Sequence, residues 1–282
     1  MRDMIKEKYI KDFGISLEIV ELCGKTEDAL REQFREVERI REFNQLKVIQ
    51  AMQKNKLSDS HFAGSTGYGY GDRGREVLDS VFADVFGAED AIVRSQIVSG
   101  THALMVAMAG NLRPEDGLVS ITGKPYDTLE EAIGIRGEGT GSLKEFGINY
   151  RQHEITVDGE IDIEGLNKVI TADTKMCLIQ RSRGYAWREA IGIDQIRDAI
   201  IAVKKIKADV IILVDNCYGE FVEEYEPTEV GADLIAGSLI KNPGGGLALS
   251  GGYIAGKKEY VEMAAYRLTS PGIGKEVGAT LG

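Results

Sequence analysis

Three short motifs carry side chains that could do chemistry. Ser99, Gly100 and Thr101 open a helical pattern after an apolar segment, where backbone N–H groups and small hydroxyl groups suit a phosphate. Asp215 ends the apolar segment VIILVDN, and a buried carboxylate there needs a partner such as magnesium, a ribose hydroxyl or a protonated heterocyclic nitrogen. Lys241 follows another apolar segment and precedes a proline and three glycines. Partial desolvation predicts a lowered pKa for Lys241, which would let it form a Schiff base.

Each motif alone also has an ordinary structural explanation. Ser99 could simply cap a helix, Asp215 could cap a loop, and Lys241 could be a solvated residue at a strand end. Taken together, they supply a phosphate-binding helix start, an acid for a pyridinium nitrogen and a Schiff-base lysine. Those are the parts that a pyridoxal phosphate (PLP) enzyme needs. The sequence therefore predicts PLP as the cofactor.

Composition narrows the classes of partner. The chain has 282 residues and a net charge of −11, so it lacks the basic balance that nucleic-acid binding requires. Its cysteines, Cys23, Cys177 and Cys217, are widely spaced and odd in number, which argues against a disulfide framework or a zinc site. No apolar run approaches the ~20 residues of a membrane span. We expect a cytoplasmic protein that acts on a small molecule, with no nucleic-acid or membrane partner and no bound metal.

The three motifs lie at the ends of regularly alternating elements. Apolar segments of strand length cover residues 91–96, 117–122, 175–182, 208–216, 232–241 and 251–257. Amphipathic helical patterns cover residues 75–89, 99–110, 126–134 and 193–207. This alternation predicts a mostly parallel sheet with helices on both faces. In such sheets ligands bind beyond the carboxyl ends of the strands, where the motifs lie.

The first part of the chain has a different pattern. Residues 1–57 read as a helical arm, with Thr26 as a candidate cap for a helix reaching residue 56. The arm has an apolar stripe, so we expect it to pack against the main domain or a second subunit. A Gly/Ser/Tyr-rich loop over residues 58–74 follows. The predicted domains are an arm at 1–57, a cofactor-binding domain at 58–262, and the start of a C-terminal region at 263–282.

Five segments carry a resemblance to a known family. They are GYGYGDRGREVLD, SQIVSGTHAL, TGKPYDTLEE, ILVDNCYGEF and GSLIKNPGGGLALSGGYIAG. Over roughly residues 62–282 the chain resembles fold-type-I PLP enzymes of cysteine and methionine metabolism. More closely, it is similar to the cystathionine β-lyase-like "aluminium resistance" proteins. The resemblance implies an α/β fold of the aspartate aminotransferase type, with a seven-stranded, mostly parallel sheet. It also implies that the family's small C-terminal domain, with its substrate-binding arginine, is missing after Gly282.

The resemblance assigns roles to residues around the cofactor. It implies that Lys241 forms the internal aldimine and that Asp215 holds the pyridinium proton. Tyr126 would stack on the ring. The residues that would hold the phosphate are Ser99, Gly100, Thr101 and Ser238.

Other residues receive looser roles from the same resemblance. Ser182 and Arg183 would contact the ring or the substrate. Tyr70 and Arg73 would serve the phosphate site of a neighbouring subunit, with Tyr68 an equal candidate for the tyrosine. His102 is either a second neighbour of the ring or an ordinary helix histidine.

These assignments predict a PLP-dependent carbon–sulfur lyase acting on a sulfur-containing amino acid. The composite phosphate site predicts a homodimer or homotetramer. An aminotransferase or decarboxylase on the same fold stays open as an alternative, because the cofactor residues are shared. A non-catalytic binding module is a third reading. A dinucleotide-binding dehydrogenase is disfavoured, since no G-x-G-x-x-G follows a strand.

Overall fold

The computed structural model describes residues 2–278. The last four residues of the predicted C-terminal region, 279–282, lie outside the described residues. By its internal contacts the chain divides into two units, Met1–Gln45 (unit 1) and Leu46–Gly282 (unit 2). No helix among residues 2–278 is long and apolar enough to cross a membrane.

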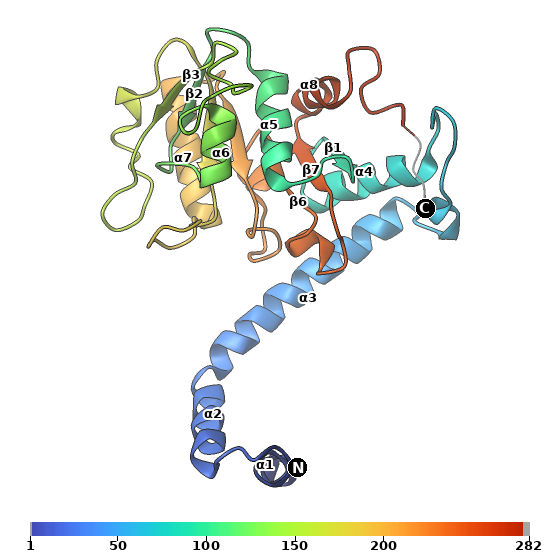
Figure 1. The fold of residues 1–282 in the computed structure, drawn as a ribbon, viewed down its shortest axis with the longest axis vertical. Coiled ribbons are helices and arrows are strands. Elements are labelled where there is room, and N and C mark those ends of the chain that lie inside the picture. Colours follow the sequence, from blue (N-terminus) through green and yellow to red (C-terminus); the bar gives the residue numbers. More distant parts are fainter. Residues whose placement is uncertain (1, 279–282) are drawn as a thin grey trace. The chain divides into compact units, whose positions relative to one another are not determined.

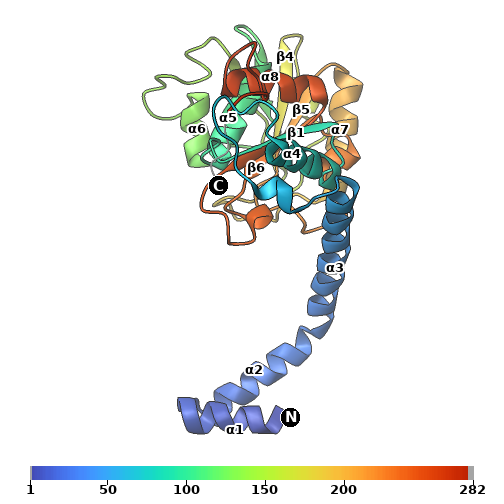
Figure 2. The same ribbon diagram turned by 90° about the vertical axis from the view of Figure 1, so that its right-hand side faces the viewer.

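Unit 1 is wholly helical. It holds α1 (Arg2–Phe13), α2 (Leu17–Ala29) and the first part of α3 (Arg31–Lys54), drawn in blue in Figure 2. The Ser16 hydroxyl caps α2 by accepting a hydrogen bond from the backbone N–H of Ile19. The predicted cap at Thr26 is wrong, because Thr26 lies inside α2 and its hydroxyl donates to the carbonyl of Leu22.

The last turns of α3 belong to unit 2. Ala51 is buried in the main core, and Lys47 lies 3.5 Å from a carboxylate oxygen of Glu229. Lys54 pairs with Asp84 at 2.5 Å. The division by contacts therefore falls within α3, between Gln45 and Leu46, and not after residue 57 as predicted. The reason is that the last turns of α3 contact the rest of unit 2.

A seven-stranded sheet forms the centre of unit 2 (Figure 1). Its strands are β1 (Asp90–Arg94), β2 (Gly117–Ser120), β3 (Asn149–Gln152), β4 (Thr174–Gln180), β5 (Ile211–Asp215), β6 (Leu234–Ser238) and β7 (Gly252–Gly256). The spatial order is β1-β7-β6-β5-β4-β2-β3, and the pairings of β7 are antiparallel while the others are parallel. Six strands overlap the predicted apolar segments. The sequence analysis did not predict β3, because NYRQ is a polar strand at the edge of the sheet, where it pairs with β2.

Helices cover both faces of this sheet, and Figure 2 shows α5 and α6 on one side with α7 on the other. One core joins α4 (Arg73–Val85) and α7 (Ile193–Ile206) to one face, and the other core joins α5 (Gly100–Asn111), α6 (Asp127–Ile133) and α8 (Lys258–Leu268) to the opposite face. Within residues 2–278, short 3₁₀ turns complete the order at Asp59–Phe62, Leu166–Lys168, Pro227–Val230 and Asn242–Gly244. Alternate residues of one strand enter opposite cores, as Val214 and Leu213 do.

Helix α8 fixes the end of the described chain. Gly110 of α5 lies so close to it that an added Cβ would come within 2.9 Å of the Ala264 Cα. The backbones of α5 and α8 therefore touch directly. The domain boundary predicted at residue 262 falls inside α8, which the sequence analysis did not identify as a helix.

Candidate functional site

The candidate site lies at the carboxyl edge of β5 and β6. Asp215 is the last residue of β5 and is 1% exposed, and its Oδ1 accepts a 3.1 Å hydrogen bond from the backbone N–H of Cys217. Burial raises the pKa of Asp215 above its usual value, because few partners offset its loss of solvation. A cationic group placed against this carboxylate would reverse that effect.

Lys241 lies in the turn that follows β6. Its Nζ atom is 4.1 Å from the centroid of the Tyr218 ring. Burial alone would lower the pKa of Lys241, but its contacts with Cys217, Asp215 and Tyr218 raise it above the usual value. The lowered pKa expected from desolvation is therefore wrong for the chain alone. Burial also raises the pKa of Cys217, so its neutral thiol acts on Lys241 as a hydrogen-bond acceptor, and the charge comes from Asp215.

The start of α5 meets the same edge. The Ser99 hydroxyl caps this helix by accepting a 3.1 Å hydrogen bond from the backbone N–H of His102. A Cβ added at Gly100 would lie 2.9 Å from the Cys217 sulfur and 3.5 Å from the Ser238 Cβ. Gly100, Cys217 and Ser238 are therefore packed against one another, and this contact leaves no room for a side chain at residue 100. The first turn of a helix directs its N–H groups outward, which suits an anion.

Tyr126 connects the helix start to the strand tips. Its hydroxyl lies 2.9 Å from the hydroxyl of Thr101, and its backbone N–H donates to the side chain of Gln180 at 3.0 Å. Gln180 is the register partner of Asp215 in the β4–β5 pair. The pKa of Tyr126 is raised by burial and by the nearby Asp215 carboxylate. Thr101, Tyr126 and Asp215 therefore belong to one cluster.

The loop after β4 holds the remaining predicted residues of this edge. The carbonyl of Ser182 accepts hydrogen bonds from Gln180 at 3.1 Å and from Arg188 at 2.6 Å. Arg183 is exposed. Both line a cavity of about 550 Å³ that also reaches Tyr218. Tyr218 connects this cavity to Lys241.

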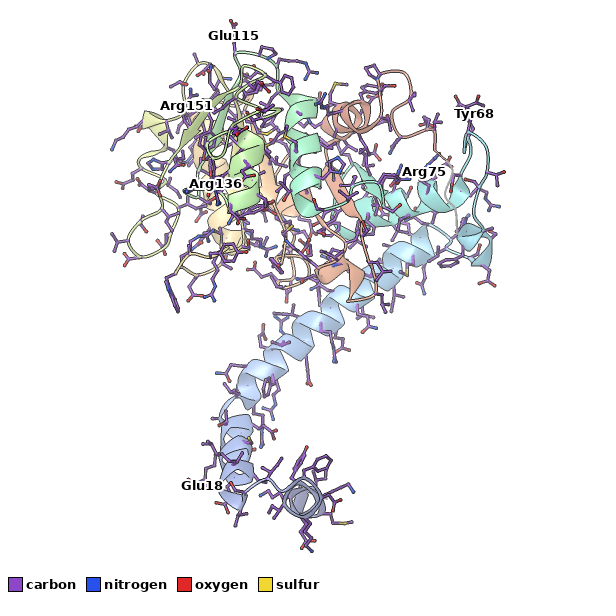
Figure 3. All side chains as sticks on the ribbon, viewed as in Figure 1. Glu18, Tyr68, Arg75, Glu115, Arg136 and Arg151 are labelled. Atoms are coloured by element: carbon purple, nitrogen blue, oxygen red, sulfur yellow. The ribbon has the colours of Figure 1, made fainter. Side chains whose placement is uncertain are left out.

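The Gly/Tyr-rich loop is not part of this cluster. Tyr70 is 73% exposed and Arg73 is exposed at the start of α4, and neither has a described contact with the residues above. Figure 3 shows Tyr68 projecting from the loop. The loop's anchor is Arg75 at the start of α4, a residue that the sequence analysis passed over.

Arg75 is 6% exposed and donates to the carbonyls of Gly69, Glu276 and Gly278 at 3.1, 2.9 and 2.7 Å. It therefore fixes the base of the loop to the segment after α8. His102 has a local role within its own helix, since its Nδ1 accepts from the backbone N–H of Val98 at 3.3 Å. That contact fits the reading of His102 as an ordinary helix histidine.

Sequence reasoning also missed a buried polar network behind Asp215. The side chain of Arg181 is 2% exposed and donates to the Asn216 side chain at 2.9 Å and to the Gly219 carbonyl at 2.7 Å. Glu226 accepts from Asn216 at 3.0 Å and lies 3.7 Å from Arg181. The sequence feature that could have indicated this network is Arg181 itself, an arginine directly after the apolar strand β4.

Comparison with known proteins identifies the family. A family model for methionine gamma-lyase matches residues 19–282. The chain belongs to the methionine gamma-lyase family. The uncharacterized protein YnbB of Bacillus subtilis (strain 168) is 56% identical over 248 residues, or 88% of this chain and 59% of YnbB.

Solved structures give the same relationship. A Listeria innocua protein, provisionally named a cystathionine beta-lyase involved in aluminum resistance, is 56% identical with a TM-score of 0.92, over 94% of this chain and 65% of its own. A carbon–sulfur lyase involved in aluminum resistance from Clostridium novyi NT is 49% identical with a TM-score of 0.92, over 97% and 66%. The resemblance predicted from the sequence is confirmed. This chain spans less than two thirds of the length of YnbB and about two thirds of the solved relatives.

More distant structures bear on the fold alone. The PLP-dependent protein YhfS from Escherichia coli is 18% identical with a TM-score of 0.62 over 82% of this chain. The predicted α/β fold with a mostly parallel seven-stranded sheet is confirmed. The family implies PLP as cofactor, while the role of each site residue stays a prediction.

Proposed function

We propose that the protein is a PLP-dependent carbon–sulfur lyase that acts on a sulfur-containing amino acid, of the cystathionine or methionine type. One observation carries the proposal. Lys241, Asp215 and the start of α5 at Gly100 converge at the carboxyl edge of the sheet, around a single thiol, Cys217. An amine, a buried carboxylate and a helix start are the groups that the aldehyde, the ring nitrogen and the phosphate of PLP require.

The residues fit this cofactor. Gly100 lets the first turn of α5 pack directly against Cys217 and Ser238, because a Cβ at residue 100 would lie only 2.9 Å from the Cys217 sulfur. Asp215 is a buried carboxylate whose pKa is raised by burial, and a cationic ring nitrogen placed against it would offset that burial. Lys241 would hold the cofactor covalently, Ser238 and Thr101 would hold its phosphate, and Tyr126 would lie against its ring.

The chain's own side chains then have distinct tasks. When bound, PLP supplies an electron sink for the charge left on the substrate Cα. Asp215 would keep a proton on the ring nitrogen, because a carboxylate that is 1% exposed strongly favours a paired cation. Lys241 is the amine that would remove the Cα proton in its neutral form and return it to the departing thiol. The contact of the Tyr126 hydroxyl with Thr101 would fix the Tyr126 ring beside the cofactor.

The quaternary structure belongs to the same proposal. We infer a homodimer or homotetramer in which the Gly/Tyr-rich loop of one subunit, with Arg73 and Tyr70 or Tyr68, completes the phosphate site of another. This idea rests on the separation of the loop from the site within one chain. It also rests on the many exposed apolar side chains of unit 1, including Phe13, Phe34 and Val37. The cytoplasmic location stays a prediction.

The proposal can be tested on the purified full-length protein. Adding PLP should produce a yellow species, and borohydride should fix the cofactor on the peptide that contains Lys241. Cystathionine or methionine should then yield ammonia, a 2-oxo acid and a thiol. A 2-oxo acid that forms only with an acceptor keto acid would point to an aminotransferase, and loss of CO₂ would point to a decarboxylase. A protein that stays colourless with PLP would overturn the proposal.

A further inference from the structure

Tyr218 has an unusual backbone for its residue type. Its φ is +67°, in the left-handed region that a bulky L-residue rarely adopts. Phe221, three residues on, has a φ of +64°. Strained positions of this kind persist only where surrounding contacts fix them. The turn at residues 216–219 therefore holds Tyr218 in a conformation that must be imposed from outside.

Arg181 imposes it. The guanidinium donates to the Gly219 carbonyl at 2.7 Å and to the Asn216 side chain at 2.9 Å, so it grips the turn on both sides of Tyr218. Gly219 lies directly on the stem of Arg181, since an added Cβ would come within 2.3 Å of its Cδ. The turn is closed by a 2.8 Å hydrogen bond from the Gly219 N–H to the Asn216 carbonyl.

The result is an aromatic face turned to the amine of the site. The Lys241 Nζ lies 4.1 Å from the centre of the Tyr218 ring, within the distance of a cation–π contact. A second tie joins the same two segments, because the Asn242 side chain donates to the Glu220 carbonyl at 2.9 Å. Two adjacent contacts thus fix the Lys241 turn against the turn after β5.

We propose that the Tyr218 ring is a platform that holds the Lys241 ammonium in place, and that buried Arg181 is the positioning residue that fixes this platform. The catalytic importance of this platform rests on the proposed function, in which Lys241 is the cofactor lysine. The contact between Lys241 and Tyr218 does not depend on that assignment. Asp215 and Cys217 also face the amine, but from the strand tip, and they are the same in every variant below.

The test is the rate of lysine acetylation by acetic anhydride, measured residue by residue by mass spectrometry on the full protein without PLP. Tyr218→Phe keeps the ring, and Tyr218→Asn removes it while suiting a left-handed backbone. Phe should leave the labelling of Lys241 unchanged. Asn should speed it on the order of two- to tenfold and lower the pH of half-maximal labelling by roughly 0.3 to 1, because loss of a cation–π contact weakens proton binding by that factor.

Lys257 is the matched control. It follows β7 at the opposite edge of the sheet and pairs with Asp233 at 2.7 Å, so its labelling should not change. If Asn leaves both lysines at the wild-type rate, or Phe acts like Asn, the platform is overturned. If Asn also alters Lys257, Tyr218→Gly replaces it, because glycine accepts the same backbone, and the same two outcomes decide.

Arg181→Lys tests the second half of the proposal. It should speed the labelling of Lys241 like Tyr218→Asn, and combining the two should add nothing, since both act through one contact. Wild-type labelling in Arg181→Lys would remove Arg181 from the proposal. Added PLP separates this inference from the proposed function. If PLP fails to protect Lys241 while the Tyr218 effect is present, the cofactor assignment fails and the platform stands.

Discussion

The hydroxyl of Tyr253 donates a 2.8 Å hydrogen bond to Oε1 of Glu220, and both side chains are almost fully buried. The second carboxylate oxygen of Glu220 has no hydrogen-bond partner among the described residues. Burial raises the pKa of Glu220 to about 7. A buried acid with only one oxygen satisfied is stable when protonated and costly when charged.

This pair predicts a fall in stability with rising pH. The folded-state pKa of Glu220 lies above the usual 4.5, so the folded state binds the extra proton between about pH 4.5 and 7. Stability should therefore decrease across that window and level off above it, by on the order of 2–4 kcal/mol from this group. Urea unfolding of the wild type and of Glu220→Gln between about pH 5 and 8 measures the difference.

The glutamine variant cannot ionise, so its stability should change less with pH than that of the wild type. Asp215 and Glu226 also have raised pKa values, and subtracting the two curves removes their common contribution. Glu164→Gln on the exposed surface is the control and should match the wild type. Parallel curves for the wild type and Glu220→Gln would show that Glu220 ionises normally.

Gly100→Ala should displace the start of α5, where we expect the phosphate to bind. The new methyl would lie 2.9 Å from the Cys217 sulfur, closer than real Cβ contacts allow, and 3.5 Å from Ser238. We expect PLP affinity to fall roughly tenfold or more, with a stability loss of about 1–3 kcal/mol from overpacking. Titration of PLP absorbance and urea unfolding measure the two effects.

A second substitution makes that result specific. Cys217→Ala removes the sulfur that the new methyl meets, so Gly100→Ala/Cys217→Ala should recover part of the lost PLP affinity. Gly24→Ala in α2 meets no atom within 4 Å and is the control. Equal PLP affinity in Gly100→Ala and the wild type would place the phosphate elsewhere.

Asp215→Asn should raise stability and lower activity. The buried carboxylate has a raised pKa, so at about pH 8 its charge costs free energy that a neutral amide avoids, and we expect a gain of about 1–2 kcal/mol without PLP. Turnover should fall roughly 100-fold or more, because the ring nitrogen loses its anionic partner. Urea unfolding and thiol release measure the two changes. Equal turnover would remove Asp215 from the site.

The sequence predicted the parts of this fold in which apolar strands alternate with amphipathic helices. β5 and β6 are continuous apolar runs whose ends carry Asp215 and, three residues beyond β6, Lys241, and both occur where parallel-sheet logic puts them. β3 could not be predicted, because a four-residue polar edge strand has no periodic signal. The prediction of Thr26 as a helix cap was wrong, because its hydroxyl donates to a carbonyl within its own helix.

The site shows the same division. The positions of Ser99 and Gly100 could be predicted, because a helix start after a strand has a local sequence signature. The roles of Arg181 and Tyr218 could not be predicted, since they depend on contacts between the loops after β4, β5 and β6. The raised pKa of Lys241 was missed for a related reason: burial acts on one residue, but the opposing effect of Asp215 and Cys217 comes from another strand tip.

Arg73 tests whether subunits share the site. Arg73 is exposed and has no described contact with the cluster around Lys241. If it binds the cofactor phosphate, it therefore does so in the site of a neighbouring subunit. Arg73→Ala should weaken PLP binding by about 1.5–3 kcal/mol, the contribution of a charged hydrogen bond. Mixing Arg73→Ala with Lys241→Ala subunits should restore some intact sites, because each heterodimer would contain one site with both residues. PLP absorbance after co-refolding, with light scattering to follow assembly, measures this. Recovery in the mixture but in neither variant alone requires exchange between subunits. A persistent dimer whose mixture binds no more PLP than the separate variants would show that Arg73 does not act across the interface.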